Sequence, residues 1–438
     1  MIITRTAILL ILTLCALPLS ANGVLRNGAG ARGMSTGGDG LVFSNDPLNA
    51  MNSNPAALSR WDDSELLLGL TAAILDAEYS NSVSTDNEAD STPRLIPDVA
   101  YVHALGNRLT LGASVSPVSS LEADWEFPDP PGALGVTFGQ QTHKSSFIAL
   151  RSAVGLGYQV NPRFSIGTSV GLIYNRNRLK APYIFQSHPI LAGALGGVKV
   201  LTNLEADGFG WNGVFSATYR LHDDVELGLS YTTETDFEAT GTIRGLAPLG
   251  IGSFTHDAEV ETHLPQIVST GLSWEINDPL RIGFQVDWID WSDAFEDLPL
   301  HLTNGTNAVL NGILGSTSID DTAPLNWKDR FVYRLGLEYD WSEQLQLRAG
   351  YSFGESPVQS ETLTPTTAAI MKHTLGFGAG YRMGKYNIDL AYQWDLPTED
   401  GVGTSQLLAG EYNNSEVDVS IHWLSIAISF TDPYRRDK

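Results

Sequence analysis

Histidine is the residue in this chain with the most obvious use in catalysis, and its nine copies are scattered. Acyl transfer or ester hydrolysis would need a hydroxyl nucleophile, a histidine and an acid that converge at one site. No recognisable nucleophile motif accompanies the histidines. They are His103, His143, His188, His222, His256, His263, His301, His373 and His422. We therefore expect that the protein is not an enzyme and has no catalytic residues.

Cysteine chemistry is excluded by count. Cys15 is the only cysteine, and it lies in an apolar run near the N-terminus. Removal of that run would leave a chain with no disulfide, no zinc–thiolate site and no cysteine nucleophile. We expect no metal site and no cofactor.

A set of charged residues has a spacing that suits ion pairs between neighbouring strands. Arg334 and Glu338 alternate with apolar residues, and Arg348 occupies the same kind of position in the next segment. A turn at residues 342–344 would place Glu338 opposite Arg348. We expect Arg334, Glu338 and Arg348 to form a polar ladder on one face of paired strands.

Segments with period-2 alternation must position these side chains. From residue 280 to 288, for example, Leu280, Ile282, Phe284, Val286 and Trp288 share one face of an extended chain. Such alternation predicts strands with one apolar and one polar face. It fits a soluble sandwich, with its apolar face inward, and equally an outer-membrane barrel, with its apolar face toward lipid.

The connections between the segments favour a barrel. Short turns, such as residues 106–108, 161–162, 277–279 and 342–344, alternate with long polar stretches near residues 76–96, 119–146, 179–208, 243–255, 292–329, 355–371 and 396–415. Short turns on one rim and long loops on the other are typical of outer-membrane barrels. We predict an all-β, antiparallel transmembrane barrel of about 14 strands, an even number as in bacterial barrels.

The N-terminus predicts export. Arg5 precedes an apolar run from Ala7 to Leu19, and the small residues Ser20 and Ala21 follow. This arrangement indicates a signal peptide over residues 1–21, because the run is too short to span a bilayer as a helix. The net charge of -24 argues against nucleic acid as a partner, since phosphate binding needs clustered Lys and Arg.

Residues 22–64 predict a different kind of structure. The segment is rich in glycine, and Asn45-Asp46-Pro47 and Asn54-Pro55-Ala56 each look like a helix start. It is too short to fold alone, so it needs a host cavity. We predict a hatch at 22–64 inside a barrel of residues 65–430, with a C-terminal tail at 431–438.

Several motifs, taken in order, resemble the FadL/TodX family of outer-membrane transporters. The N-terminal ones are Gly30-Ala31-Arg32-Gly33, Asp46 and Asn54-Pro55-Ala56. The later ones are residues 264–272, 287–292, 327–329, 334–339, 347–351 and Pro357. Each is weak alone, but together they cover nearly all of the expected mature chain.

The resemblance implies a monomeric barrel, plugged by its hatch, that carries long-chain fatty acids or hydrocarbons through the outer membrane of a Gram-negative bacterium. It implies ligand capture among outer loops and sideways exit at a kinked strand near the Asn-Pro-Ala motif, here Asn54, Pro55 and Ala56. Pro117 is the candidate wall kink, although it also fits an ordinary strand end. The Asn54 side chain is expected to cap a helix or to bond to the wall. Apolar loop patches at 190–195 and 308–314 fit a hydrophobic ligand.

The expected partners are outer-membrane lipids, the hydrophobic ligand and the outer-membrane assembly machinery. The last strand alternates from Leu424 to Phe430 and ends in an aromatic residue, which assembly machinery typically reads. An alternative remains, because some members of the family work in protein secretion: a structural or secretion-associated barrel without a small-molecule substrate.

Overall fold

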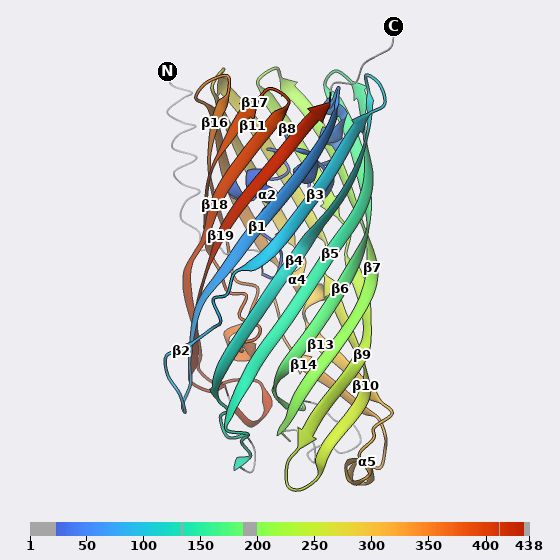
Figure 1. The fold of residues 1–438 in the computed structure, drawn as a ribbon, viewed down its shortest axis with the longest axis vertical. Helices are drawn as coiled ribbons and strands as arrows, with labels where there is room; N and C mark the ends of the chain where they lie inside the picture. The colour runs from blue at the N-terminus through green and yellow to red at the C-terminus, as the bar shows by residue number, and fades with distance from the viewer. Residues whose placement is uncertain (1–22, 133–134, 187–198, 411, 433–438) are drawn as a thin grey trace.

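The computed structural model describes residues 23–132, 135–186, 199–410 and 412–432. The predicted signal peptide lies outside the described residues, as do the loop patch at 190–195 and the chain end at 433–438. Among the helices of the described part, none is long and apolar enough to cross a bilayer. Figure 1 shows a tall barrel with short helices inside it.

The strands account for most of the described chain. They are β1 (Ser64–Ser80), β2 (Asn87–Glu88), β3 (Arg94–Ala104), β4 (Leu109–Pro128), β5 (Gln140–Asn161), β6 (Phe164–Ile184), β7 (Lys199–His222), β8 (Val225–Thr232), β9 (Thr235–Ala247), β10 (Gly252–Leu264), β11 (Ile267–Asn277), β12 (Leu280–Ile289), β13 (Asp297–Thr303), β14 (Ile319–Pro324), β15 (Arg330–Asp340), β16 (Leu345–Gly354), β17 (His373–Met383), β18 (Tyr386–Val402) and β19 (Ser415–Asp432).

The sheet closes on itself, as the sequence predicts. β1 pairs antiparallel with β3 on one side and with β19 on the other, from Ser64↔Asp432 to Ser80↔Glu416. The wall consists of fourteen antiparallel segments, each of which runs from one rim of the barrel to the other. Four of these segments are interrupted and are therefore each described as two strands: β8/β9, β11/β10, β12/β13 and β15/β14. The two-residue strand β2 pairs with β1 as an addition to the wall. Closure leaves no exposed sheet edge at the level of the β1–β19 seam.

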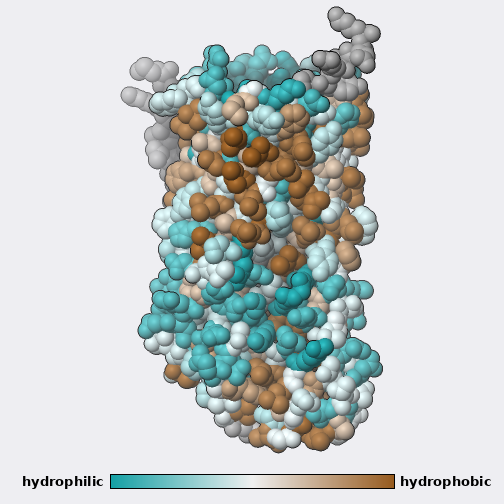
Figure 2. All heavy atoms as spheres, viewed as in Figure 1, coloured by the Kyte–Doolittle hydropathy of each residue, from teal (hydrophilic) through white to brown (hydrophobic). Residues whose placement is uncertain are grey.

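An apolar belt surrounds the half of the barrel that carries the short turns. Outward side chains there include Leu68, Val154, Trp211, Leu337 and Ile426, all exposed. Figure 2 shows this belt in brown, with a polar band between it and the long loops. In an outer-membrane barrel, such a belt marks the lipid-contacting zone. The strands therefore continue beyond the membrane on the loop side.

The length of these extensions corrects the predicted loops. Most of 119–146 and much of 179–208 are strand. The stretch 292–329 contains β13, β14 and α5 (Ala308–Leu314), and α4 (Trp291–Ala294) overlaps its start. In the extension of β4 the outward face is polar, whereas the apolar side chains of Ala123, Trp125 and Phe127 point inward and are buried, so the alternation of the belt is reversed there. Trp423 of β19 points inward and is buried.

The segment from residue 23 to residue 63, called the hatch below, lies inside the barrel. Its helices are α2 (Gly30–Ser35), α3 (Pro47–Asn52) and the 3-10 helix η2 (Pro55–Arg60). α2 contacts β16, β17, β18 and β19, whereas η2 contacts β4, β5, β6 and β7. The structure places Ser64 in β1, and Thr431 and Asp432 in β19, so these residues belong to the wall. The hatch thus touches opposite sides of the lumen.

Candidate functional site

A largely apolar cavity lies in the lumen on the loop side of the hatch. This outer cavity has a volume of about 230 Å³. Its apolar wall includes Phe147, Leu179, Ile184, Val260 and Leu325, and Val24 of the hatch also reaches it. Transfer of apolar surface from water into such a site is favourable in proportion to the area buried. The cavity is therefore suited to bind a hydrophobic molecule.

An aromatic cluster supports one side of the outer cavity. Phe295 and Trp327, which line it, have ring centroids 4.7 Å apart in a stacked arrangement. Trp291 packs edge-on against Trp327 at 5.2 Å. Clusters of this kind bury large, rigid apolar surfaces. Of the loop patch predicted at 308–314, Leu310 and Leu314 are buried in α5, whereas Val309 and Ile313 are exposed.

The barrel wall has a break between β3 and β4. Their ladder runs from Ala104↔Thr110 to Val99↔Val115 and then stops. If it continued in register, Pro97 would face Pro117. Proline has no N–H to donate to a ladder, so a pair of prolines at this level ends it. Opposite β5, β4 also shifts register between Pro117 and Ser119, which marks a bulge at the predicted kink.

Residues 94–98 of β3 and 116–124 of β4 form no ladder with each other, and the opening between them is called the wall gap below. On the loop side it ends where residue 89 bridges to Trp125. On the inside, the hatch occupies part of the free edge of β4. Leu25 bridges to Ser119, and the N–H of Arg26 donates to the Val118 carbonyl at 3.0 Å. The hatch thus replaces some of the hydrogen bonds that β3 does not supply.

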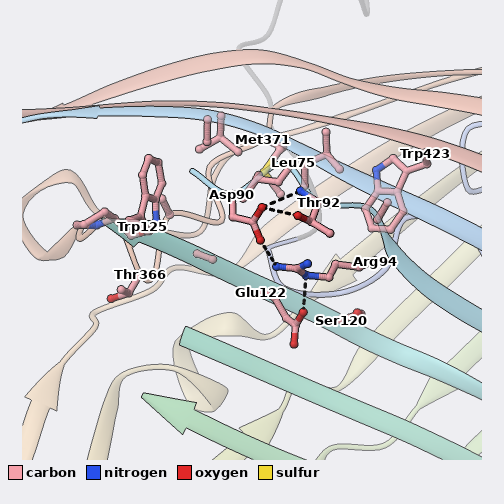
Figure 3. Close-up of a pocket in the computed structure, with 17 residues that line it drawn as sticks. Leu75, Asp90, Thr92, Arg94, Ser120, Glu122, Trp125, Thr366, Met371 and Trp423 are labelled. Atoms are coloured by element: carbon pink, nitrogen blue, oxygen red, sulfur yellow. Dashed lines mark hydrogen bonds and ion pairs between the residues drawn. The ribbon is translucent and has the colours of Figure 1, made fainter. Parts of the chain in front are cut away.

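A second, smaller cavity of about 50 Å³ lies at the wall gap and is called the wall cavity (Figure 3). Its inner side is formed by Leu75, Trp125, Met371 and Trp423. Thr366 lines both this cavity and the outer cavity. The loop between β16 and β17 therefore lies between the two cavities.

Charged side chains form the outward side of the wall cavity. Figure 3 shows Arg94 between Asp90 and Glu122. The Arg94 guanidinium lies 2.9 Å from the Glu122 carboxylate and 3.0 Å from that of Asp90. The hydroxyl and N–H of Thr92 donate to Asp90 and, together with Arg94, lower the pKa of Asp90 to about 2. Asp90 therefore stays ionised at any pH near neutrality.

The predicted gate motif contacts the wall differently from either expectation. Asn54 does not cap η2, and its Nδ2 donates instead to the Leu41 carbonyl at 2.8 Å, within the hatch. The contact with the wall comes from the next residues, because the N–H of Ala56 donates to Ser216 Oγ at 2.7 Å. The side chain that reaches the strand beside Pro117 is that of Asn52, whose Nδ2 donates to Ser116 Oγ at 2.9 Å.

The predicted polar ladder lies in the lumen, against the hatch. Glu338 and Arg348 are register partners, with Oε1 and Nε 3.4 Å apart, and both are buried. Arg348 also pairs with Asp389 at 2.7 Å, and Arg334 pairs with Asp287 at 2.7 Å. Asn27 of the hatch accepts a hydrogen bond from Arg334. These contacts hold the hatch and face away from the lipid.

One group in the described residues has ligand types and spacing that fit a metal ion. Its potential ligand atoms, from Glu234, Asp236 and His263, lie within 4.8 Å of one another. His263 Nδ1 is already 2.8 Å from Asp236, which is exposed, and Glu234 and His263 are half-buried. Such a group is equally typical of a solvated surface cluster, and it lies apart from both cavities.

Sequence reasoning missed the residues that border the wall gap. Pro97, Arg94 and Glu122 were not singled out, although a signal existed. Ala104 and Thr110 pair across the turn at 106–108, so counting outward from that pair places Pro97 opposite Pro117. The residues of the two cavities come from strands and loops far apart in sequence, and no local pattern links them.

Comparison with known proteins gives a consistent result. The family model described as "Outer membrane protein transport protein (OMPP1/FadL/TodX)" matches residues 12–431. The long-chain fatty acid transport protein of Salmonella typhi is 20% identical over 387 residues, covering 81% of this chain and 82% of that protein. The toluene transporter TodX of P. putida superposes with a TM-score of 0.75 at 22% identity, covering 93% of this chain and 100% of TodX. The Ralstonia pickettii toluene transporter TbuX gives a TM-score of 0.75 at 21% identity, with 92% and 98% covered.

Proposed function

Since this chain belongs to the OMPP1/FadL/TodX family of outer-membrane transport proteins, we propose that it carries hydrophobic small molecules, either long-chain fatty acids or hydrocarbons, across the outer membrane of a Gram-negative bacterium. Long-chain fatty acids and toluene are the substrates named for its relatives. Both are apolar over most of their surface, so both fit an apolar cavity. The named relatives are transporters, which favours transport over the alternative of a secretion-associated or structural barrel.

The outer cavity is the observation that carries this proposal. It lies in the lumen of a barrel whose turn side contains the hatch, and about 230 Å³ of largely apolar space remains on the loop side. A water-filled pore would need a polar lining, whereas apolar walls favour a ligand that water hydrates poorly. The cavity therefore supports capture of such a ligand before it crosses the membrane.

The route onward leads to the wall gap. The loop between β16 and β17 separates the outer cavity from the wall cavity, and the wall cavity borders the gap between β3 and β4. Arg94 precedes Leu95, an exposed apolar residue on β3, so the gap lies at the edge of the lipid-contacting belt. A hydrophobic ligand that left there would enter lipid directly and would avoid the polar hatch.

We also propose the remaining features of such a transporter. The protein acts as a monomer, is inserted by the outer-membrane assembly machinery and contacts outer-membrane lipids through its belt. It catalyses no reaction and needs no cofactor. Residues 1–21 act as a signal peptide, and residues 23–63 act as a hatch that blocks free diffusion.

Uptake of a radiolabelled fatty acid or toluene, in cells that lack their own transporter, tests the proposed function. Ala181 is buried and lines the outer cavity, so Ala181→Phe fills part of it. We expect this variant to insert normally and to lose most uptake. Ala217 faces lipid between the exposed Phe215 and Tyr219, and Ala217→Phe is the matched control. Unchanged uptake by Ala181→Phe, at equal surface expression, would contradict the proposal.

A further inference from the structure

The wall gap needs a closure other than a β-ladder. Backbone pairing ends at Val99↔Val115, and the hatch covers the inner edge of β4 only near Val118 and Ser119. Farther along β4, the inward side chains of Ala123 and Trp125 line the wall cavity. The side chains at the outward side of the gap lie between that cavity and the exterior.

Those side chains span the gap from both edges. Arg94 is the first residue of β3, and Glu122 lies on β4 with its side chain toward the outside. Their ion pair of 2.9 Å therefore joins two strands that share no ladder bond at this level. Both side chains are partly exposed, at 32% and 25%, which places the pair at the outer mouth of the wall cavity.

Asp90 fixes the direction of the Arg94 side chain. Its carboxylate lies 3.0 Å from the guanidinium and is itself held by Thr92. The N–H of Asp90 donates to the Asp124 carbonyl of β4 at 2.8 Å, so the loop that carries Asp90 is attached to the far edge of the gap. Asp90 is thus a positioning residue: it holds Arg94 extended toward Glu122.

We propose that Arg94 and Glu122, positioned by Asp90, form a side-chain latch that closes the wall gap and opens to release ligand sideways. This inference rests on the proposed function and names the part that regulates it. A partly exposed ion pair is weak and can break without unfolding its strands. A ladder of backbone hydrogen bonds cannot open singly in the same way, because each lost bond leaves two unpaired groups in lipid. The latch thus allows a closed wall at rest and a brief opening.

A comparison of one protein before and after cross-linking tests the latch. Apart from Cys15 the chain has no cysteine, so Arg94→Cys combined with Glu122→Cys introduces a unique pair in the mature protein. A bis-maleimide joins these cysteines across the gap. We expect the cross-link to lower the initial rate of toluene uptake by about tenfold relative to the same protein before cross-linking, because opening is then blocked.

The matched control uses a neighbouring ion pair that spans the intact β4–β5 ladder instead of the gap. Asp124 and Lys144 are register partners in the β4–β5 ladder and form an ion pair of 2.5 Å. Asp124→Cys combined with Lys144→Cys, cross-linked in the same way, should leave uptake unchanged. Glu122→Gln should raise the initial rate, whereas Asp124→Asn should not.

The outcomes separate the latch from the transport function. If the 94–122 cross-link leaves uptake unchanged while Ala181→Phe abolishes it, the protein transports but the latch is wrong. Equal loss in both cross-linked pairs would also overturn the latch, since it would show a general effect of rigidity. If Ala181→Phe has no effect either, the proposed function fails together with the latch.

Discussion

Two of the places where the hatch meets the barrel wall are closed by different means. At β5 and β6 the ladder is long, running from Lys144↔Lys180 to Asn161↔Phe164, and η2 lies against it. At β3 and β4 the ladder is short, and beyond it the wall depends on the hatch edge and on the Arg94–Glu122 ion pair. A barrel can therefore be rigid on one side of its hatch and able to open on another side.

Two residue types account for this difference. At the rigid side, Gly167 lets the hatch backbone lie directly on the wall, because a β-carbon there would overlap Pro55 and Ala56. At the gap, Pro97 and Pro117 remove the N–H groups that a ladder would need. Glycine permits close approach, and proline ends pairing, so the sequence itself separates the two regions.

The largest expected effect comes from a charge placed in the lipid belt. Leu337 is an outward residue in the middle of β15, where the ladders to β12 and β16 are continuous. Leu337→Arg should cost about 2–4 kcal/mol of folding free energy if the site lies near the bilayer midplane, and Leu95→Arg, beside the gap, about 0–1 kcal/mol. Urea titration in lipid vesicles measures both. Equal costs would place the gap at the midplane rather than at the edge of the belt.

The rigid side can be disturbed with one methyl group. Gly167→Ala should destabilise the protein by about 1–3 kcal/mol, since the new β-carbon meets backbone atoms of the hatch that cannot rotate away. Gly403→Ala is the matched control, because a β-carbon at Gly403 meets no heavy atom within 4 Å. The check is the urea midpoint together with protease sensitivity of the hatch. A tolerated Gly167→Ala would show that the hatch is loosely seated there as well.

Much of this architecture follows from local patterns. Alternation and turn spacing predict a closed barrel and also the register at the 342–344 turn, where Glu338 faces Arg348. Asp46 caps α3 as expected, accepting from the N–H groups of Leu48 and Asn49. Such features depend on neighbours in sequence or on one hairpin, so a single sequence contains the information.

The parts that could not be predicted depend on distant contacts. Beyond the belt the outward residues of a strand are as polar as those of a loop, so the sequence predicts a loop where β4 extends to Pro128. Asn54 matched a cap motif, but its amide turns back to Leu41 because the hatch folds on itself. The roles of Asn54, Pro55, Ala56 and Pro117 in gating stay predictions.

Substitution of Asn54 tests whether a contact within the hatch affects transport as well as stability. Asn54→Asp removes the amide donor and sets a carboxylate beside the Leu41 carbonyl, where both are buried. We expect a loss of about 1–2 kcal/mol, as for other unsatisfied buried groups, and reduced uptake in a protein that still inserts. Urea titration and uptake of a labelled fatty acid measure the two effects. Normal uptake by Asn54→Asp, with failed assembly of Asn54→Ala, would leave Asn54 a purely structural role.

The smallest expected effect distinguishes the two regions most directly. Ser116 on β4 accepts a hydrogen bond from Asn52 at 2.9 Å beside the gap, and Ser165 on β6 bonds to Ser59 at 2.9 Å on the rigid side. Ser116→Ala and Ser165→Ala each delete one neutral hatch–wall bond, so each should cost about 0.5–1.5 kcal/mol. Their stabilities should therefore be similar, but their transport should not. Ser116→Ala loosens the hatch where it covers the free edge of β4, so it should change the initial uptake rate, whereas Ser165→Ala should not. If both variants change uptake equally, the hatch moves as a whole, and the division into a rigid side and an opening side is wrong.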